Sequence, residues 1–296
     1  MSWRVTLHCT RAEAEALPES EDLFAFSDAP PVIVADEPDP HAPDDWRIHA
    51  YFEDQPTTQE LVLLRRLAVG AEPEVEHLED STDWVTHSQQ GLEPIRAGRF
   101  FVHTPMHFSE RLADTVNFEI DAGLAFGTGQ HDTTAGCLAA LDRLETSGKR
   151  FANIADIGTG TGLLAFAALA LWPGAKAIAT DIDPVSIDVT EENAVINGIR
   201  VGHGAGEVLL AVADGMEHPL LTARAPFDLL IANILAGPLV ELAPAFAKAC
   251  APGASIVLAG LLDTQADAVV AAYVAQGCTV VERGDGEWCV LVLQAP

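Results

Sequence analysis

The sequence is poor in basic side chains. Its 296 residues include 16 lysines and arginines against 44 aspartates and glutamates, which gives a formal net charge of −28. Such a surface repels phosphate backbones, so we expect no direct contact with nucleic acid. A basic protein is the more compatible partner, although the same acidity is also explained by solubility alone.

Paired cysteines and long apolar runs are missing as well. The five cysteines are an odd number and no two form a CxxC pair, which is typical of reduced thiols and argues against a disulfide framework or a zinc site. The first residues lack a basic head followed by an apolar stretch, so we expect no signal peptide. The most apolar helix candidate, residues 162–171, is too short to cross a bilayer. These features predict a cytoplasmic protein with no metal site and no membrane contact.

Apolar residues, by contrast, are plentiful, since 49% of the chain is hydrophobic. Residues 1–80 are rich in Glu, Asp and Pro, and their short segments follow the order β-α-β-β-α-β. That order is typical of a small ferredoxin-like α+β domain. Residues 81–99 are polar and rich in turn formers, and we interpret them as a linker with one helix near residues 83–89.

From residue 100 to residue 296, strands and helices alternate. Five apolar strands are expected at residues 151–156, 177–181, 208–212, 227–232 and 255–259. Strands that alternate with helices predict an α/β, Rossmann-like fold, in which helices cover both faces of a parallel sheet. Two further strands, 278–282 and 288–293, flank a glycine-containing turn. They bring the expected sheet to seven strands, one of which runs antiparallel.

The central motif is Asp156-Ile157-Gly158-Thr159-Gly160-Thr161-Gly162, between an expected strand and an expected helix. Gly158 and Gly160 allow the backbone to pass close to a ligand at the carboxyl edge of the sheet. The GxGxG spacing departs from the GxGxxG of dinucleotide-binding loops. It favours a ligand without a pyrophosphate, and a tight turn that binds nothing is the alternative.

Aspartates follow the next two strands. Asp181 ends the second strand, where a carboxylate can accept both hydroxyls of a ribose and reject a 2′-phosphate. Asp183, directly before Pro184, is suited to cap the following helix. Asp214 follows the third strand and is placed to meet an adenine amino group, although a simple Asp-Gly turn explains it almost as well.

Asn233 ends the fourth strand, which in an open parallel sheet borders the ligand crevice. Its side-chain carbonyl can orient an attacking amine, so Asn233 is the candidate catalytic residue. In enzymes that methylate planar amide or base nitrogens, an asparagine at this strand end is often followed by Pro-Pro and an aromatic residue. Ile234 and Leu235 follow here, which favours an aliphatic amine as the acceptor.

Upstream of the first strand, the glycines at residues 123–129 lead into a helix start that carries Thr133 and Thr134. Amide and hydroxyl groups at a helix N-terminus suit a carboxylate such as that of methionine. An ordinary capped helix, with Asp132 or Thr133 as the cap, is the alternative. His131 is a candidate base, but a lone histidine is more often structural.

At these positions the sequence resembles the bacterial ribosomal protein L11 methyltransferase family (PrmA), and the resemblance covers nearly the whole chain. It is carried by Gly-Leu-Ala-Phe-Gly-Thr-Gly at 123–129, Thr133-Thr134, residues 232–238, Leu78-Glu79-Asp80 with Asp83-Trp84, and Glu287-Trp288-Cys289. The resemblance implies a class I methyltransferase domain that uses S-adenosylmethionine, preceded by an N-terminal domain that docks the ribosomal protein.

In that family, the residues that match Thr134, Gly158, Asp181 and Asn233 contact S-adenosylmethionine. Together with the two positions argued above, the expected cofactor-binding residues are Thr134, Gly158, Gly160, Asp181, Asp214 and Asn233. The implied reaction is methyl transfer to lysine side chains and the N-terminal amine of protein L11. The amine must first lose a proton, which a low-dielectric pocket favours, and we name no general base.

Three other functions remain open. The first is methylation of lysines on another protein, such as an electron-transfer flavoprotein subunit, but enzymes of that kind lack the N-terminal domain. The second is RNA methylation, against which the net charge of −28 argues. The third is a non-catalytic role in binding S-adenosylmethionine, which a test of methyl transfer from labelled cofactor distinguishes from the enzyme.

Overall fold

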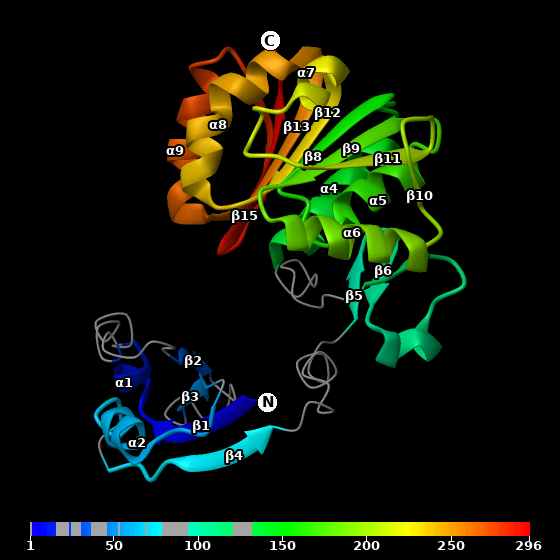
Figure 1. Ribbon diagram of the computed structural model, residues 1–296. Coiled ribbons are helices and arrows are strands. Elements are labelled where there is room, and N and C mark those ends of the chain that lie inside the picture. Colours follow the sequence, from blue (N-terminus) through cyan, green and yellow to red (C-terminus); the bar gives the residue numbers. More distant parts are fainter. Residues whose placement is uncertain are drawn as a thin grey trace. The chain divides into compact units, whose positions relative to one another are not determined.

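The structure is a computed structural model with two compact units, Met1–His87 and Ser88–Pro296 (Figure 1). The predicted linker helix near residues 83–89 and the glycines at residues 123–129 lie outside the described residues, as does His131. No helix in the described ranges is long and apolar enough to span a membrane. These ranges are residues 2–15, 24, 31–36, 46–52, 54–68, 70–78, 94–120 and 132–296.

The first unit contains a four-stranded antiparallel sheet in the order β2-β3-β1-β4. Its elements are β1 (Ser2–Cys9), α1 (Arg11–Glu15), β2 (Val32–Asp36), β3 (Trp46–Phe52), α2 (Thr58–Leu64) and β4 (Glu74–Leu78). The chain order and the strand order are those of a ferredoxin-like domain, as predicted. Leu7, Ile48 and Leu64 are fully buried in its core, and Thr57 and Glu60 form a reciprocal capping box at the start of α2.

The second unit contains an eight-stranded sheet in the order β10-β11-β9-β8-β12-β13-β15-β14. Its strands are β8 (Asn153–Ile157), β9 (Lys176–Asp181), β10 (Arg200–Val201), β11 (Glu207–Val212), β12 (Phe227–Asn233), β13 (Cys250–Leu262), β14 (Thr279–Arg283) and β15 (Trp288–Gln294). Neighbours from β10 to β13 pair in parallel, whereas β15 is antiparallel to β13 and β14. The predicted Rossmann-like fold with one reversed strand is confirmed, and the eighth strand is the two-residue edge strand β10.

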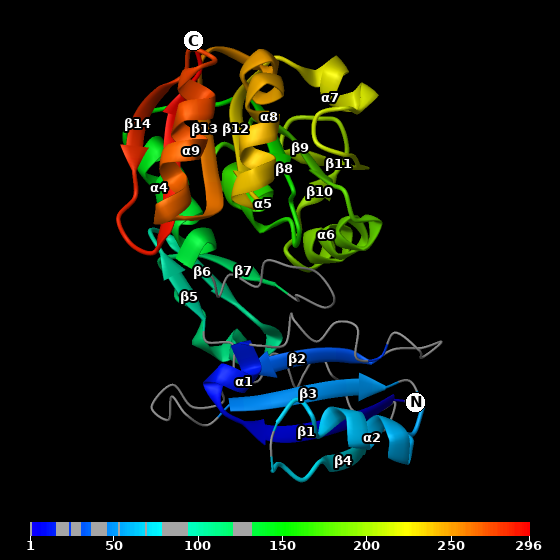
Figure 2. The same cartoon turned by 90° about the vertical axis from the view of Figure 1, so that its left-hand side faces the viewer.

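Helices cover both faces of this sheet (Figures 1 and 2). Ile154 and Ile231 belong to a core formed with the helices on one face, whereas Ala155 and Leu230 belong to the core on the other. This alternation follows from the two-residue repeat of a strand. The first face carries α4 (Asp132–Thr146), α5 (Leu163–Leu171) and α6 (Pro184–Ile196), and the second carries α7 (Pro219–Arg224), α8 (Ala236–Ala249) and α9 (Asp263–Val274).

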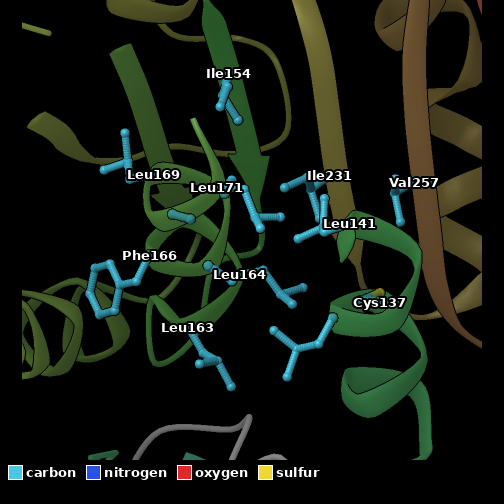
Figure 3. Packing of buried hydrophobic residues seen from close by; sticks show 14 of the residues in the cluster. Cys137, Leu141, Ile154, Leu163, Leu164, Phe166, Leu169, Leu171, Ile231 and Val257 are labelled. Atoms are coloured by element: carbon cyan, nitrogen blue, oxygen red, sulfur yellow. The ribbon is translucent and has the colours of Figure 1, made fainter. Parts of the chain in front are cut away.

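Figure 3 shows the first of these cores, where α4 and α5 meet the middle of the sheet. Leu141 of α4 and Leu164 of α5 lie beside Ile231 of β12. Helix α5 is apolar on every side and eight of its nine residues are buried, as expected for a helix in the interior of an α/β domain. This packing fixes the start of α5, and therefore the end of the loop that precedes it.

Three strands beside the main sheet were not predicted. They are β5 (Ile95–Ala97), β6 (Phe100–His103) and β7 (Val116–Glu119), with the 3-10 segment η2 (Pro105–Glu110) between β6 and β7. Phe100 and Phe118 stack and are buried in the core of the second unit. Strand β5 lies within the segment that we interpreted as a linker, so the last part of that segment belongs to the second unit.

Candidate active site

The carboxyl edge of the main sheet carries the predicted site residues that follow strands. Strand β8 has β9 on one side and β12 on the other. The chain leaves β8 for β9 and β11, and later returns to the other side of β8 as β12. In open α/β sheets, ligands bind at such a reversal of strand order, outside the carboxyl ends of the strands.

The loop after β8 has a left-handed backbone at three glycines. The φ angles are 72° at Gly158, 56° at Gly160 and 85° at Gly162, a region that favours glycine. The amides of Gly158 and Thr159 donate to the carbonyl oxygen of Thr180, at 2.8 Å and 2.9 Å. The start of the loop is thereby bonded to the end of β9.

Helix α6 holds the other side of the same loop. The hydroxyl of Thr190 donates to the carbonyl oxygen of Gly160 at 2.7 Å, and the side-chain amide of Asn193 donates to the carbonyl oxygen of Thr161 at 3.1 Å. Thr190 and Asn193 are buried. Sequence reasoning did not name either residue, and their polar character at core-facing positions of a predicted helix was the available signal.

Asp181 is the half-buried last residue of β9. Its Oδ2 accepts a hydrogen bond from the Gly160 amide at 2.9 Å, and its Oδ1 accepts one from the Asp183 amide at 3.1 Å. A carboxylate can accept about four hydrogen bonds, so capacity remains for a ligand. Asp183 caps α6 through the Val185 amide at 2.9 Å, as predicted.

The structure brings Asn233 and Thr134 together from positions 99 residues apart in the chain. The side-chain nitrogen of Asn233 donates to the Thr134 hydroxyl oxygen at 3.3 Å. Thr134 lies in the first turn of α4 and is 3% exposed. Because the nitrogen donates to Thr134, the side-chain carbonyl oxygen of Asn233 is directed away from the Thr134 hydroxyl and is a hydrogen-bond acceptor.

Asp214 lies on the same edge, one residue after Ala213, whose amide donates to the carbonyl oxygen of Asp181 at 2.8 Å. The carbonyl oxygen of Asp214 accepts a hydrogen bond from the Glu217 amide at 3.2 Å, so Asp214 begins a turn. The side chain of Asp214 is exposed. The turn and a ligand contact through the carboxylate are therefore compatible.

Asp156 is a buried carboxyl group for which the sequence suggested no role, and it is 1% exposed. Its Oδ2 accepts from the Thr159 hydroxyl at 2.7 Å and from the Ala165 amide at 3.1 Å, whereas Oδ1 has no hydrogen-bond partner in the described part of the chain. Burial raises the pKa of Asp156 to about 7. The bonds from Thr159 and Ala165 lower this pKa, and the charge of Asp181 raises it.

Among the described residues, no group of His, Cys, Asp and Glu side chains could hold a metal ion. The five cysteines are buried thiols, and burial raises the pKa of Cys137, Cys250, Cys278 and Cys289.

The sheet order and the glycine loop at its carboxyl edge define a class I methyltransferase. The model of the family "Ribosomal protein L11 methyltransferase (PrmA)" matches residues 3–296. The chain belongs to this family, and the predicted membership is confirmed.

Relatives and a solved structure agree with that assignment. A Brucella abortus (strain S19) protein named ribosomal protein L11 methyltransferase is 50% identical over 198 residues, which are 67% of this chain and 67% of the relative. A protein of the same name from Caulobacter sp. (strain K31) is 42% identical over 290 residues, 97% of this chain and 95% of the relative. The crystal structure of ribosomal protein L11 methylase from Lactobacillus delbrueckii subsp. bulgaricus has a TM-score of 0.59 at 27% identity, covering 68% of this chain and 98% of that chain.

The raised pKa of Asp156 predicts a pH-dependent stability that Asp156→Asn removes. Between pH 3.8 and about 7 the folded chain keeps a proton that the unfolded chain loses, so the contribution of Asp156 to stability is full below this window and is lost as the pH rises through it. Each unit of pKa difference is worth about 1.4 kcal/mol. We would measure urea unfolding of the wild type and of Asp156→Asn between pH 3.8 and about 7. The free energy of unfolding of the variant should rise relative to that of the wild type as the pH rises. A constant difference would show that Asp156 does not titrate in this way.

Proposed function

We propose that this chain transfers methyl groups from S-adenosylmethionine to lysine side-chain and N-terminal amines of ribosomal protein L11. The observation that carries the proposal is the hydrogen bond between Asn233 and Thr134, beside the glycine loop of a chain that belongs to the L11 methyltransferase family. An oriented amide carbonyl at that position suits an amine acceptor.

The donors and acceptors at the carboxyl edge fit S-adenosylmethionine. Gly158 and Gly160 place no side chain between the loop backbone and a ligand, and Asp181 keeps acceptor capacity for the two hydroxyls of a ribose. Asp214 is exposed on the loop after the next strand, where an adenine amino group would meet it. The residues that we propose to hold the cofactor are Thr134, Gly158, Gly160, Asp181, Asp214 and Asn233.

Bound S-adenosylmethionine supplies a methyl group already activated by its positively charged sulfur. The residues of the chain then have to position and desolvate the amine. The carbonyl oxygen of Asn233 accepts a hydrogen bond from the amine and directs its lone pair, and the Thr134 hydroxyl keeps the amide in that orientation. Leu235, two residues along, is 73% exposed and offers an apolar surface to the methylenes of a lysine. The amine reacts in its neutral form, and its proton leaves to water.

The first unit is proposed to dock the protein substrate through residues 1–80. The methyltransferase domain, predicted at residues 100–296, is proposed to begin with β5 (Ile95–Ala97), which shortens the predicted linker of residues 81–99. The family model includes this unit, because its match begins at residue 3. On the edge strand β2, Val32 and Val34 are 65% and 43% exposed, which suits a protein contact. The net charge of −28 favours a basic partner. We place the reaction in the cytoplasm, consistent with five cysteines that are all buried thiols.

The substrate is tested by mass spectrometry of proteins from cells that lack the gene. Protein L11 should lose its lysine and N-terminal methyl groups, and the wild-type gene, but not one with Asn233→Ala, should restore them. Purified L11 should also accept label from S-adenosylmethionine in the presence of the enzyme. If L11 kept its methyl groups while another protein, such as an electron-transfer flavoprotein subunit, lost them, the substrate assignment would be wrong.

Asp181→Asn should weaken cofactor binding, because it removes the charge and one acceptor from the proposed ribose contact. Loss of a charge-assisted hydrogen bond costs about 1.5–3 kcal/mol, which corresponds to roughly 10- to 100-fold in affinity. Titration calorimetry with S-adenosylhomocysteine measures the change. Asp183→Asn is the matched control, since asparagine also caps helices well, and its affinity should stay at the wild-type value. Equal affinities in the two variants would remove Asp181 from the site.

Thr134→Val should lower kcat by about tenfold or more, because the Asn233 amide loses the bond that orients it. Thr134→Ser keeps the hydroxyl and should retain most of the activity. Asn233→Ala should abolish methylation of L11 while the folded protein persists. Single-turnover assays with labelled cofactor measure all three variants. A Thr134→Val enzyme as fast as Thr134→Ser would mean that the hydrogen bond does not orient the amide during transfer.

A further inference from the structure

Strand β13 contains a β-bulge directly beside Asn233. On its side facing β15, Leu258 pairs with Leu291 and Leu261 pairs with Cys289, with a register shift between them. Two residues of β13, Ala259 and Gly260, therefore lie opposite Val290 alone. Gly260 has a φ of +86°, as is common for a glycine in a bulge.

On the other side of β13, the backbone of Ile234 crosses Gly260 in close contact. The Ile234 amide donates to the carbonyl oxygen of Ala259 at 3.1 Å. A Cβ atom on Gly260 would lie 2.7 Å from the carbonyl carbon of Ile234 and 2.9 Å from its nitrogen, and closer still to its carbonyl oxygen. These are backbone atoms, so any side chain on Gly260 would displace the segment that leaves β12.

The side chain of Ile234 contacts a second glycine. A Cβ atom on Gly158 would collide with the Cγ2 methyl of Ile234. Ile234 thus contacts the proposed cofactor loop through its side chain and the bulge of β13 through its backbone. It is the residue directly after Asn233, so these two contacts also fix where the Asn233 side chain begins.

We infer that Gly260 and Ile234 are positioning residues for methyl transfer, which hold the Asn233 amide in register with the loop at Gly158. Neither residue supplies a group to the reaction. Bulges next to active sites commonly re-aim a side chain, and the bulge of β13 does so here by making room for the backbone of Ile234. The inference rests on the proposed function, because it assigns a role to the position of Asn233.

Gly260→Ala is the first test, and Gly253→Ala is its matched control. Gly253 lies in the same strand with a φ of +76°, and the atom nearest to an added Cβ is the side-chain nitrogen of Gln294 at 3.7 Å. Both variants therefore carry similar backbone strain, but only Gly260→Ala displaces Ile234. A displacement of about 1 Å near the reacting atoms can cost about 100-fold in rate. We expect that loss of kcat in Gly260→Ala and a nearly unchanged kcat in Gly253→Ala.

Two further readouts separate positioning from general damage. Affinity for S-adenosylhomocysteine should fall by less than kcat in Gly260→Ala, because Asn233 is one of several proposed cofactor contacts whereas the amine depends on its position alone. Hydrogen exchange of the Ile234 amide should become faster in Gly260→Ala alone, because its bond to Ala259 is disturbed. Equal kcat values in the two glycine variants, or cofactor affinity that falls as far as kcat, would overturn the inference.

If Gly260→Ala does not fold, two variants of Ile234 test the same positioning role. Ile234→Val keeps a methyl group against Gly158, whereas Ile234→Ala removes it. The alanine variant should lose more in kcat than in affinity for S-adenosylhomocysteine, and the valine variant should recover most of the rate. Equal rates in Ile234→Ala and wild type would overturn the inference. A wild-type enzyme without activity on protein L11, measured in parallel, would instead contradict the proposed function.

Discussion

The fixed path of the backbone after β8 is the constraint on which the site depends. This loop has a left-handed backbone at Gly158, and its polar groups bond to neighbouring elements on two sides. Its first amides donate to the carbonyl oxygen of Thr180, and its later carbonyl oxygens accept from Thr190 and Asn193 of α6. Buried backbone groups need such partners. Because Thr180 accepts the amides of Gly158 and Thr159, Asp181 accepts the Gly160 amide with one oxygen and keeps acceptor capacity for a ligand.

Much of the fold could be predicted because its signals are local. The central strands are apolar runs bounded by turn-forming or polar residues, and the cap at Asp183 follows from its place before Pro184. The small sheet formed by β5, β6 and β7 was not predictable in this way. Its strands are three or four residues long, too short for a periodic pattern. Phe100 and Phe118 are buried because distant parts of the chain cover them. The residues next to them in the sequence do not indicate this burial.

The same distinction applies to the candidate site. Gly158, Asp181 and Asn233 could be placed on one edge from sequence because parallel strands end together. The hydrogen bond from Asn233 to Thr134 could not be predicted from sequence, since it joins residues 99 positions apart. They meet because α4 packs on the sheet. Gly260 did leave a signal, because a glycine that follows an apolar strand often marks a bulge or a close backbone approach. What it approaches is visible only in three dimensions.

A neutral amide at the position of Asn233 has a physical reason beyond its hydrogen bond. The edge already carries the carboxylates of Asp181 and Asp214, which favour a positive charge nearby. A carboxylate at residue 233 would pair with a lysine ammonium and raise its pKa, so the lone pair needed for attack would stay protonated. An amide carbonyl accepts a hydrogen bond without adding a charge, and in the proposed mechanism the bond to the Thr134 hydroxyl sets which end of the amide faces the amine. The acidic residues can then attract a basic substrate while the reacting nitrogen meets a neutral acceptor.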